Sequence, residues 1–101
     1  HYPVWVADMN GAVIAGLIMV FEGNAASIAN IAVDPSYQGQ KIGGALMAFA
    51  EEQAVSNGLT EIQLATHILL TENIALYQHL GYIETGREDN KVFMCKSLAI
   101  I

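Results

Sequence analysis

Hydrophobic and polar positions along the chain first change period near residue 40. Before that point lie three apolar runs rich in β-branched residues: 4–7, 12–21 and 27–33. Asn10-Gly11 tolerates the positive φ angles of a two-residue hairpin turn, Gly23-Asn24 marks a second turn, and Asp34-Pro35 ends the third run. The pattern predicts an antiparallel meander. Its middle strand lacks clean alternation, which predicts that both of its faces are covered.

From residue 45 the apolar spacing becomes helical. An amphipathic stripe over 45–57 consists of four side chains: Leu46, Phe49, Ala50 and Ala54. Gly58 suits the C-terminus of this helix, and the alternating run at 61–65 predicts a strand. A strand, a helix and a strand in this order imply a right-handed parallel crossover.

The last third predicts a second helix and a closing hairpin. The helix covers 72–80, with Thr71 as its N-cap and Gly81 just beyond its C-terminus. Two strands follow, around a turn at 87–90: 82–85 and 92–98. Residues 1–101 therefore form one α+β domain, whose mixed, mostly antiparallel sheet has a central parallel strand pair and carries two helices.

The composition excludes several classes of partner. Ten acidic and four basic side chains give a formal net charge of −6, so neither nucleic acid nor an anionic membrane surface is expected as a partner. The longest apolar run, Ala12 to Phe21, is about half of the ~20 residues that a membrane-spanning helix needs. Cys95 is the single cysteine, and no Cys/His pairs typical of zinc sites occur. We expect a cytoplasmic protein without a metal.

A glycine-bearing segment lies between the third strand and the first helix. It comprises Gln38, Gly39, Gln40, Lys41, Ile42, Gly43 and Gly44. Backbone N–H groups at such a place, together with the helix dipole, can hold a phosphate. The segment matches neither a P-loop nor a dinucleotide fingerprint, and glycines that merely allow close packing explain it equally well.

The second helix offers a pair of polar side chains. Asn73 and Tyr77 are one turn apart, so an amide and a phenol can address one ligand. The competing interpretation is that Tyr77 is a core aromatic with its hydroxyl at the rim.

In this order and spacing, the two segments resemble the Gcn5-related N-acetyltransferase (GNAT) family. The family motif Gln/Arg-x-x-Gly-x-Gly/Ala is similar to Gln38-Gly39-Gln40-Lys41-Ile42-Gly43, except at the fourth place. Asn73 to Tyr77 with Leu80-Gly81-Tyr82 resembles the family's late helix, and Val92-Phe93-Met94 its last strand. The resemblance implies an acyl-CoA N-acyltransferase fold of the three-layer α/β type. It also implies direct transfer of an acetyl group from acetyl-CoA to a primary amine of a small molecule or peptide.

The resemblance also implies a site. Acetyl-CoA would lie in the splay between the strand at Ile31, Ala32 and Val33 and the strand at 61–65, with its pyrophosphate on residues 38–44. A backbone N–H near Ile31 or Ala32 would stabilise the oxyanion. Tyr77 would protonate the departing thiolate, and Asn73 would hydrogen-bond the cofactor.

Lys41 departs from the family pattern, because it stands where a glycine is usual. If the position needs a positive φ, a lysine there costs about 1 kcal/mol. In return Lys41 places a cation beside the phosphates.

The general base is the most open assignment. His67, at the end of the strand at 61–65, is the first candidate, because histidine changes charge near neutral pH. The alternative is that His67 only caps or packs at the strand end. Glu22 is a second candidate but suits a solvated hairpin, His79 falls on an outer helix face, and Cys95 is expected as a buried structural thiol.

The acceptor cannot be read from these residues. The first strand and first two helices of the family pattern are not found, so the chain is expected to be an N-terminally truncated or minimal member. A second copy of the chain is expected to cover the apolar sheet face, giving a homodimer. The alternative to an enzyme is a non-catalytic acyl-CoA-binding or sensing domain; Tyr77 and Asn73 favour the enzyme.

Overall fold

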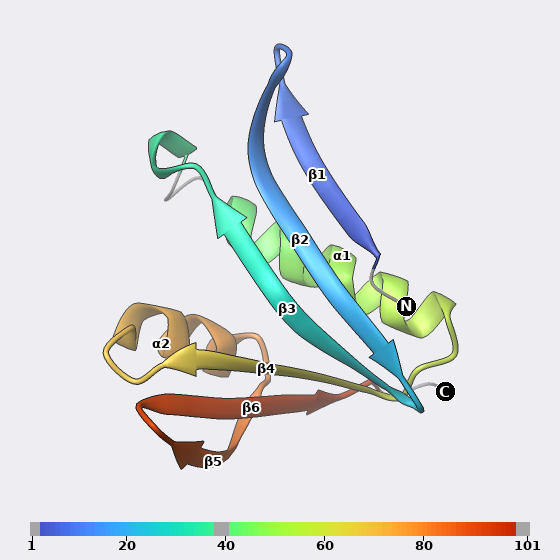
Figure 1. Ribbon diagram of the computed structural model, residues 1–101, viewed down its shortest axis with the longest axis vertical. Coiled ribbons are helices and arrows are strands. Elements are labelled where there is room, and N and C mark those ends of the chain that lie inside the picture. The colour runs from blue at the N-terminus through green and yellow to red at the C-terminus, as the bar shows by residue number, and fades with distance from the viewer. Residues whose placement is uncertain (1–2, 38–40, 99–101) are drawn as a thin grey trace.

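The computed structural model describes residues 3–37 and 41–98. Six strands and two helices follow one another along the chain: β1 (Val4–Met9), β2 (Ala12–Glu22), β3 (Ala25–Val33), α1 (Ile42–Ser56), β4 (Glu61–His67), α2 (Thr71–His79), β5 (Ile83–Glu88) and β6 (Lys91–Ser97). A 3₁₀ turn, Pro35–Tyr37, follows β3. The strands form one sheet in the order β1-β2-β3-β4-β6-β5, in which only β3 and β4 pair in parallel (Figure 1). The predicted fold class is confirmed.

Turn and cap residues set the boundaries of these elements. Asn10 (φ +53°) and Gly11 (φ +83°) both adopt the left-handed conformation of a type I′ hairpin turn, as predicted. The turn between β5 and β6 uses Asp89 (φ +49°) and Asn90 (φ +65°) in the same way. Gly58, at φ +77°, ends α1 as predicted, and its N–H donates to Val55 O.

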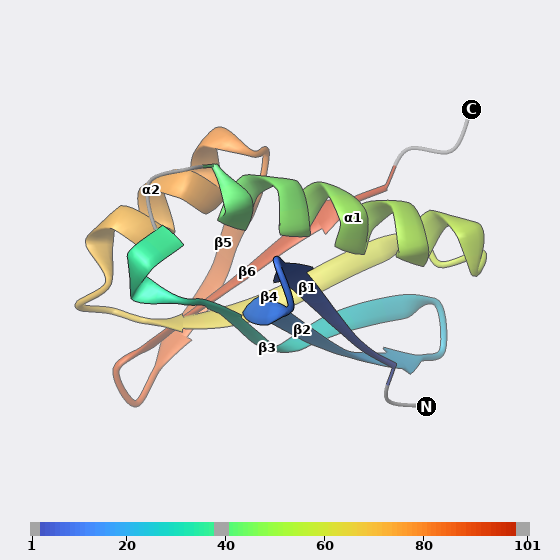
Figure 2. The same ribbon diagram turned by 90° about the horizontal axis from the view of Figure 1, so that it is seen from above.

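Both helices lie on the same face of the sheet (Figure 2). The side of α1 that contacts the sheet consists of Leu46, Met47, Ala50 and Ala54. These side chains pack over the strand residues Leu17, Met19, Ala26 and Ile62, all of them fully buried. Trp5 of β1 closes this layer with an edge contact to Phe49, at 5.3 Å between ring centroids.

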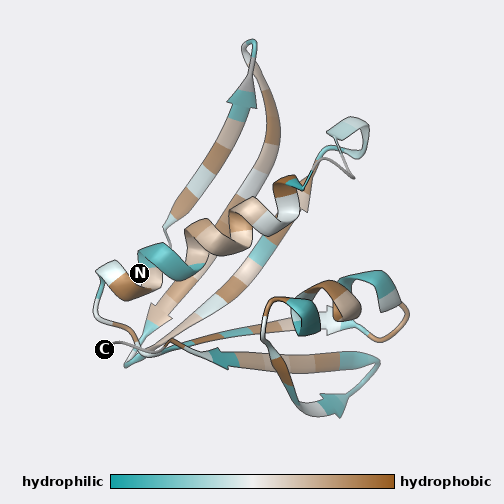
Figure 3. Ribbon diagram, turned by 180° about the vertical axis from the view of Figure 1, so that it is seen from behind, coloured by the Kyte–Doolittle hydropathy of each residue, from teal (hydrophilic) through white to brown (hydrophobic). Residues whose placement is uncertain are grey.

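Strand β2 differs from the prediction that both of its faces are covered. Leu17 and Met19 are fully buried under α1, whereas Ile18 and Val20 on the other face are half-buried. Figure 3 shows the hydrophobic and hydrophilic stripes that alternate along the strands. The apolar run therefore has one fully covered face in the described chain.

Candidate active site

The site begins where β3 and β4 separate. Their parallel pairing is limited to three residue pairs, which run from Ala25 opposite Glu61 to Ser27 opposite Gln63. Beyond them β3 stays paired with β2, and β4 stays paired with β6, so the two strands diverge in a V (Figure 1). The edge of β3 that faces the V over residues 28–32 has no β4 partner.

A bulge in the pairing of β3 with β2 lies within this segment of β3. Asn30 pairs with Ile18 and Ile28 pairs with Met19, so Ala29 is an extra residue in β3. A bulge bends its strand and redirects the neighbouring backbone groups. It therefore lies at the point where main-chain donors would have to turn toward a ligand in the V.

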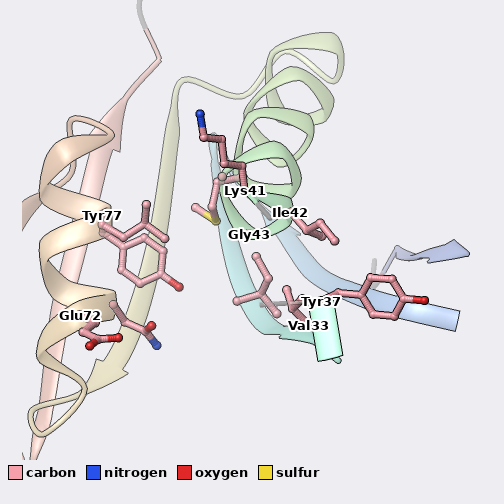
Figure 4. A pocket seen from close by; sticks show the side chains of 12 residues that line it. Val33, Tyr37, Lys41, Ile42, Gly43, Glu72 and Tyr77 are labelled. Atoms are coloured by element: carbon pink, nitrogen blue, oxygen red, sulfur yellow. The ribbon is translucent and has the colours of Figure 1, made fainter. Parts of the chain in front are cut away.

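A groove of about 490 Å³ lies at the open end of the V, between the end of β3 and the N-terminal parts of α1 and α2. Its lining consists of Ile31, Val33, Tyr37, Lys41, Ile42, Gly43, Gly44, Met47, Glu72, Asn73, Leu76 and Tyr77. In Figure 4, Glu72 and Tyr77 project from α2 on one wall, and Val33 and Ile42 form the opposite wall.

The first turn of α1 presents its backbone to the groove. Ala45 N donates to Lys41 O at 3.1 Å, so the N–H groups of residues 42–44 precede the first intrahelical hydrogen bond. A Cβ added at Gly43 or Gly44 would meet no atom within 4 Å. Close packing within the described chain therefore does not require these glycines, and they leave backbone open toward the groove.

Lys41 immediately precedes α1 in a left-handed conformation, with φ +63° and ψ +18°. This is the positive φ at which a lysine was expected to be strained, and that condition is met. The first turn of α1 contains no acidic residue, so no carboxylate on that turn opposes an anion.

Tyr77 is the single buried residue of α2, with 7% of its surface exposed. Its hydroxyl points across the groove toward the opposite wall (Figure 4). Burial raises the pKa of the Tyr77 phenol above its ordinary value, so the phenol keeps its proton at neutral pH. Asn73, one turn earlier, lines the same groove, as the helical spacing predicted.

The structure brings most of the predicted site residues together. Those that line the groove are Ile31, Val33, Lys41, Ile42, Gly43, Gly44, Asn73 and Tyr77. Ala32 is exposed on β3 and does not belong to the lining. Gln38, Gly39 and Gln40 lie outside the described residues.

His67 lies elsewhere. It is exposed at the end of β4, where Ile62, Leu64 and Thr66 alternate toward the buried side and His67 toward the other. Its Nδ1 accepts a hydrogen bond from Leu69 N at 3.1 Å. His67 thus has a structural task in the turn after β4, and its role as a base stays a prediction.

Sequence reasoning missed four lining residues: Tyr37, Met47, Glu72 and Leu76. Helical spacing could have found two of them, because Leu76 is one turn from Glu72 and Asn73, and Met47 is one turn from Gly43 and Gly44. Tyr37 belongs to the 3₁₀ turn, for which no periodic signal exists.

Cys95 is half-buried on β6 and is not part of the groove lining. Burial, with a hydrogen bond to Glu61 and the charge of that carboxylate, raises the pKa of the Cys95 thiol. A raised pKa keeps the thiol protonated and a poor nucleophile, in keeping with a structural thiol.

Comparison with known proteins identifies the family. The model of the acetyltransferase (GNAT) domain matches residues 1–84. The chain belongs to the GNAT family. It is an acetyl-CoA-dependent N-acetyltransferase, as the paired motifs predicted, and its sheet has the acyl-CoA N-acyltransferase fold.

One comparison of sequences and one of structures support this GNAT assignment. The [ribosomal protein bS18]-alanine N-acetyltransferase of Escherichia coli K12 is 35% identical over 100 residues, covering 88% of this chain and 68% of that protein. The crystal structure of the Escherichia coli ribosomal-protein-S18-alanine N-acetyltransferase superimposes with a TM-score of 0.89 at 29% identity, covering 99% of this chain and 71% of that one.

A third structure agrees in fold. The PaiA N-acetyltransferase of Thermoplasma acidophilum, solved in complex with coenzyme A, gives a TM-score of 0.90 at 21% identity, over 95% of this chain and 60% of that one. Among the described residues, neither helix of this GNAT domain has the length and apolar character needed to cross a bilayer.

Proposed function

We propose that acetyl-CoA binds in the groove between β3 and β4, with its pyrophosphate at the N-terminus of α1. The early end of the β3–β4 pairing supports this best, because it opens the sheet beside that helix terminus. The N–H groups of Ile42, Gly43 and Gly44 are the donors for the phosphate oxygens, and the Lys41 ammonium is the nearby cation. Gln38, Gly39 and Gln40, which lie outside the described residues, belong to the proposed phosphate-binding segment.

The pantetheine arm, in this proposal, follows the open edge of β3. An extended chain can pair with an exposed strand edge through main-chain hydrogen bonds. Ile31 and Val33 supply apolar contact from β3, and the Asn73 amide addresses the arm from α2. The N–H of Ile31 or Ala32, next to the bulge at Ala29, stabilises the negative charge that develops on the acetyl oxygen.

Tyr77 is the proposed general acid. Bound acetyl-CoA supplies an activated acetyl group that an amine can attack directly. The carbon–sulfur bond then breaks, and the Tyr77 hydroxyl donates its proton to the departing sulfur. Its place on the groove wall supports this assignment, and its raised pKa means that the phenol arrives at the step protonated.

The acceptor has to lose a proton as well. His67 and Glu22 stay the proposed bases, and both are exposed. Because the Nδ1 of His67 accepts the Leu69 N–H, the proton of the neutral imidazole lies on Nε2, so His67 would have to give up that turn contact to take a proton from the amine.

The acceptor that we propose is the α-amine of a polypeptide. The support is the 35% identity to an enzyme named for acetylating an alanine of ribosomal protein bS18. The net charge of −6 adds attraction for a cationic amine.

A thiol-release assay with a panel of amines tests this function. Acetyl-CoA is offered with a peptide that begins with alanine, and the matched control is the same peptide with a blocked N-terminus and an internal lysine. We expect release with the free α-amine and little with the control. Release with small amines alone would contradict the proposed acceptor, and no release with any amine would contradict the site.

We further propose that the protein works in the cytoplasm and forms a homodimer. The uncovered sheet face supports the dimer, since the exposed side chains of β1 and β2 include Val4, Val6 and Val13. Light scattering at working concentration tests it, and a monomeric mass would contradict it.

A further inference from the structure

Little packing fixes the orientation of helix α2. Of its nine residues only Tyr77 is buried, and Ile74 is half-buried. Its N-cap, Leu70, makes no side-chain hydrogen bond, although the sequence predicted Thr71 as a cap. The position of the Tyr77 hydroxyl therefore depends on what holds the C-terminal end of the helix.

Three polar side chains from distant parts of the chain meet at that end, and we name them the clamp: Glu51, Tyr82 and Lys96. Lys96 Nζ donates to Glu51 Oε1 at 2.8 Å, and the Tyr82 hydroxyl donates to Glu51 Oε2 at 3.1 Å. Both oxygens of one carboxylate on α1 are thus engaged. Lys96 also lies over the Tyr82 ring, 5.7 Å from its centroid.

The clamp holds the end of α2 directly. Lys96 Nζ donates to Leu80 O, the C-cap carbonyl of α2, at 2.8 Å. A cation at this end also interacts favourably with the helix dipole. Gly81 lies beside this contact at φ +97°, a conformation that favours glycine, and a Cβ there would only reach van der Waals contact with Lys96 Cε, at 3.4 Å.

Tyr82 connects the clamp to Tyr77. Their rings form an edge contact with centroids 6.0 Å apart, and Tyr82 N donates to Tyr77 O at 2.9 Å. Tyr82 is 2% exposed, so its ring has little freedom to move. Side chain and backbone of Tyr77 are thus both in contact with a residue that Glu51 holds.

We propose that Glu51, Tyr82 and Lys96 are positioning residues, which fix α2 so that the Tyr77 hydroxyl addresses the sulfur of acetyl-CoA. None of the three belongs to the groove lining, so they act through Tyr77. The inference rests on the proposed role of Tyr77 as the acid. A displacement of about 1 Å at a reacting group is enough to lower a rate substantially.

The ion pair between Lys96 and Glu51 is less exposed than a surface ion pair. The side chains of Lys96 and Glu51 are 29% and 20% exposed, so loss of one partner leaves a partly desolvated charge. Arg87 and Glu84 form the matched control: their side chains are 52% and 33% exposed, and such pairs contribute little.

A double-mutant cycle between Lys96 and Tyr77 tests the proposal. Lys96→Met keeps the apolar stem and removes the cation. We expect it to lower kcat about tenfold and to change the KM for acetyl-CoA less than about threefold. In a Tyr77→Phe background the same change should lower kcat less than about twofold, because no acid remains to be positioned. Equal losses in both backgrounds, or no loss in the wild type, would overturn the proposal. Arg87→Met, which removes the same charge, should leave kcat unchanged.

A second measurement tests the positioning role of these three residues independently of the proposed role of Tyr77 as the acid. In protein with ¹³C-labelled tyrosine, the Tyr77 ring signal is assigned by its loss in Tyr77→Phe. Lys96→Met should shift that signal, and Lys96→Arg should restore it. If the signal moves while Tyr77→Phe leaves kcat unchanged, the acid role is wrong, and the three residues fix the place of the Tyr77 ring without serving that role. An unmoved signal overturns the clamp. If Lys96→Met does not fold, Tyr82→Phe, which removes only the hydrogen bond to Glu51, is judged by the same signal.

Discussion

Lys41 has a strained backbone conformation and a positively charged side chain, and two substitutions separate the effects of these features. Its backbone at φ +63° and ψ +18° costs an L-residue about 1–2 kcal/mol relative to glycine, and glycine loses about 0.4–1 kcal/mol through the entropy of the unfolded chain. Lys41→Gly should therefore stabilise the fold by about 0.5–1 kcal/mol, or roughly 2–8 °C in Tm for a domain of this size. Lys41→Ala keeps a Cβ in the same conformation, so its Tm should stay at the wild-type value.

Binding of coenzyme A, unlike Tm, should not distinguish the two variants. Both lose the ammonium group, so both should bind about 2–5-fold more weakly at low salt and with a weaker salt dependence. Calorimetry at two salt concentrations and thermal unfolding supply the two measurements, with Lys91→Ala as the control because Lys91 is exposed on β6 outside the groove lining. Equal Tm values for the glycine and alanine variants would refute the strain argument. Unchanged affinity in both would refute the phosphate contact.

Two further predictions concern titrating groups. If His67 is the base, His67→Asn should lose the rise of kcat/KM with pH although its amide oxygen can still accept the Leu69 N–H; a profile like that of wild type would leave His67 only its turn contact. Burial raises the pKa of Tyr77, and burial with the Glu51 carboxylate raises that of Tyr82. Unfolding therefore releases protons from both phenols above about pH 10, so urea-measured stability should fall steeply beyond that pH, after a smaller fall from about pH 9 where the Cys95 thiol of the unfolded chain ionises. The fall should be shallower by about one proton in Tyr82→Phe, and an equal slope would show that Tyr82 is not buried as described.

Local chemistry explains why much of the fold could be predicted. Two-residue turns need positive φ at both positions, and Asn10-Gly11 supplies it cheaply. Gly81 ends α2 for the same reason, and Tyr82 N and Gly81 N donate to Tyr77 O and Gln78 O in the paired hydrogen bonds of a glycine-capped helix end.

The boundaries that differ have tertiary causes. Helix α1 begins at Ile42, three residues before the predicted start, and runs through Gly43 and Gly44. Glycine lowers helix propensity, but the first turn has no intrahelical N–H bonds to lose, so the penalty did not end the helix there. The bulge at Ala29 depends on pairing with β2, which no local pattern encodes.

The site was predictable to the extent that it follows helical spacing and turn chemistry. Asn73 and Tyr77 share a groove because they are one turn apart on one helix. The clamp was not predictable, since Glu51, Tyr82 and Lys96 are brought together only by the packing of α1 against β6 and the end of α2. Likewise, no sequence pattern shows that the Nδ1 of His67 is already engaged by a turn N–H.

The most direct test of the proposed site is a comparison of binding and turnover in Tyr77→Phe. Phenylalanine keeps the ring against Tyr82 and removes only the hydroxyl that faces the groove. The Kd for acetyl-CoA should stay within about threefold of wild type, while kcat for transfer to the alanine peptide should fall about 100-fold or more. A kcat equal to that of wild type would contradict Tyr77 as the acid, and a comparable loss of acetyl-CoA binding would show that the hydroxyl binds the substrate without donating the proton.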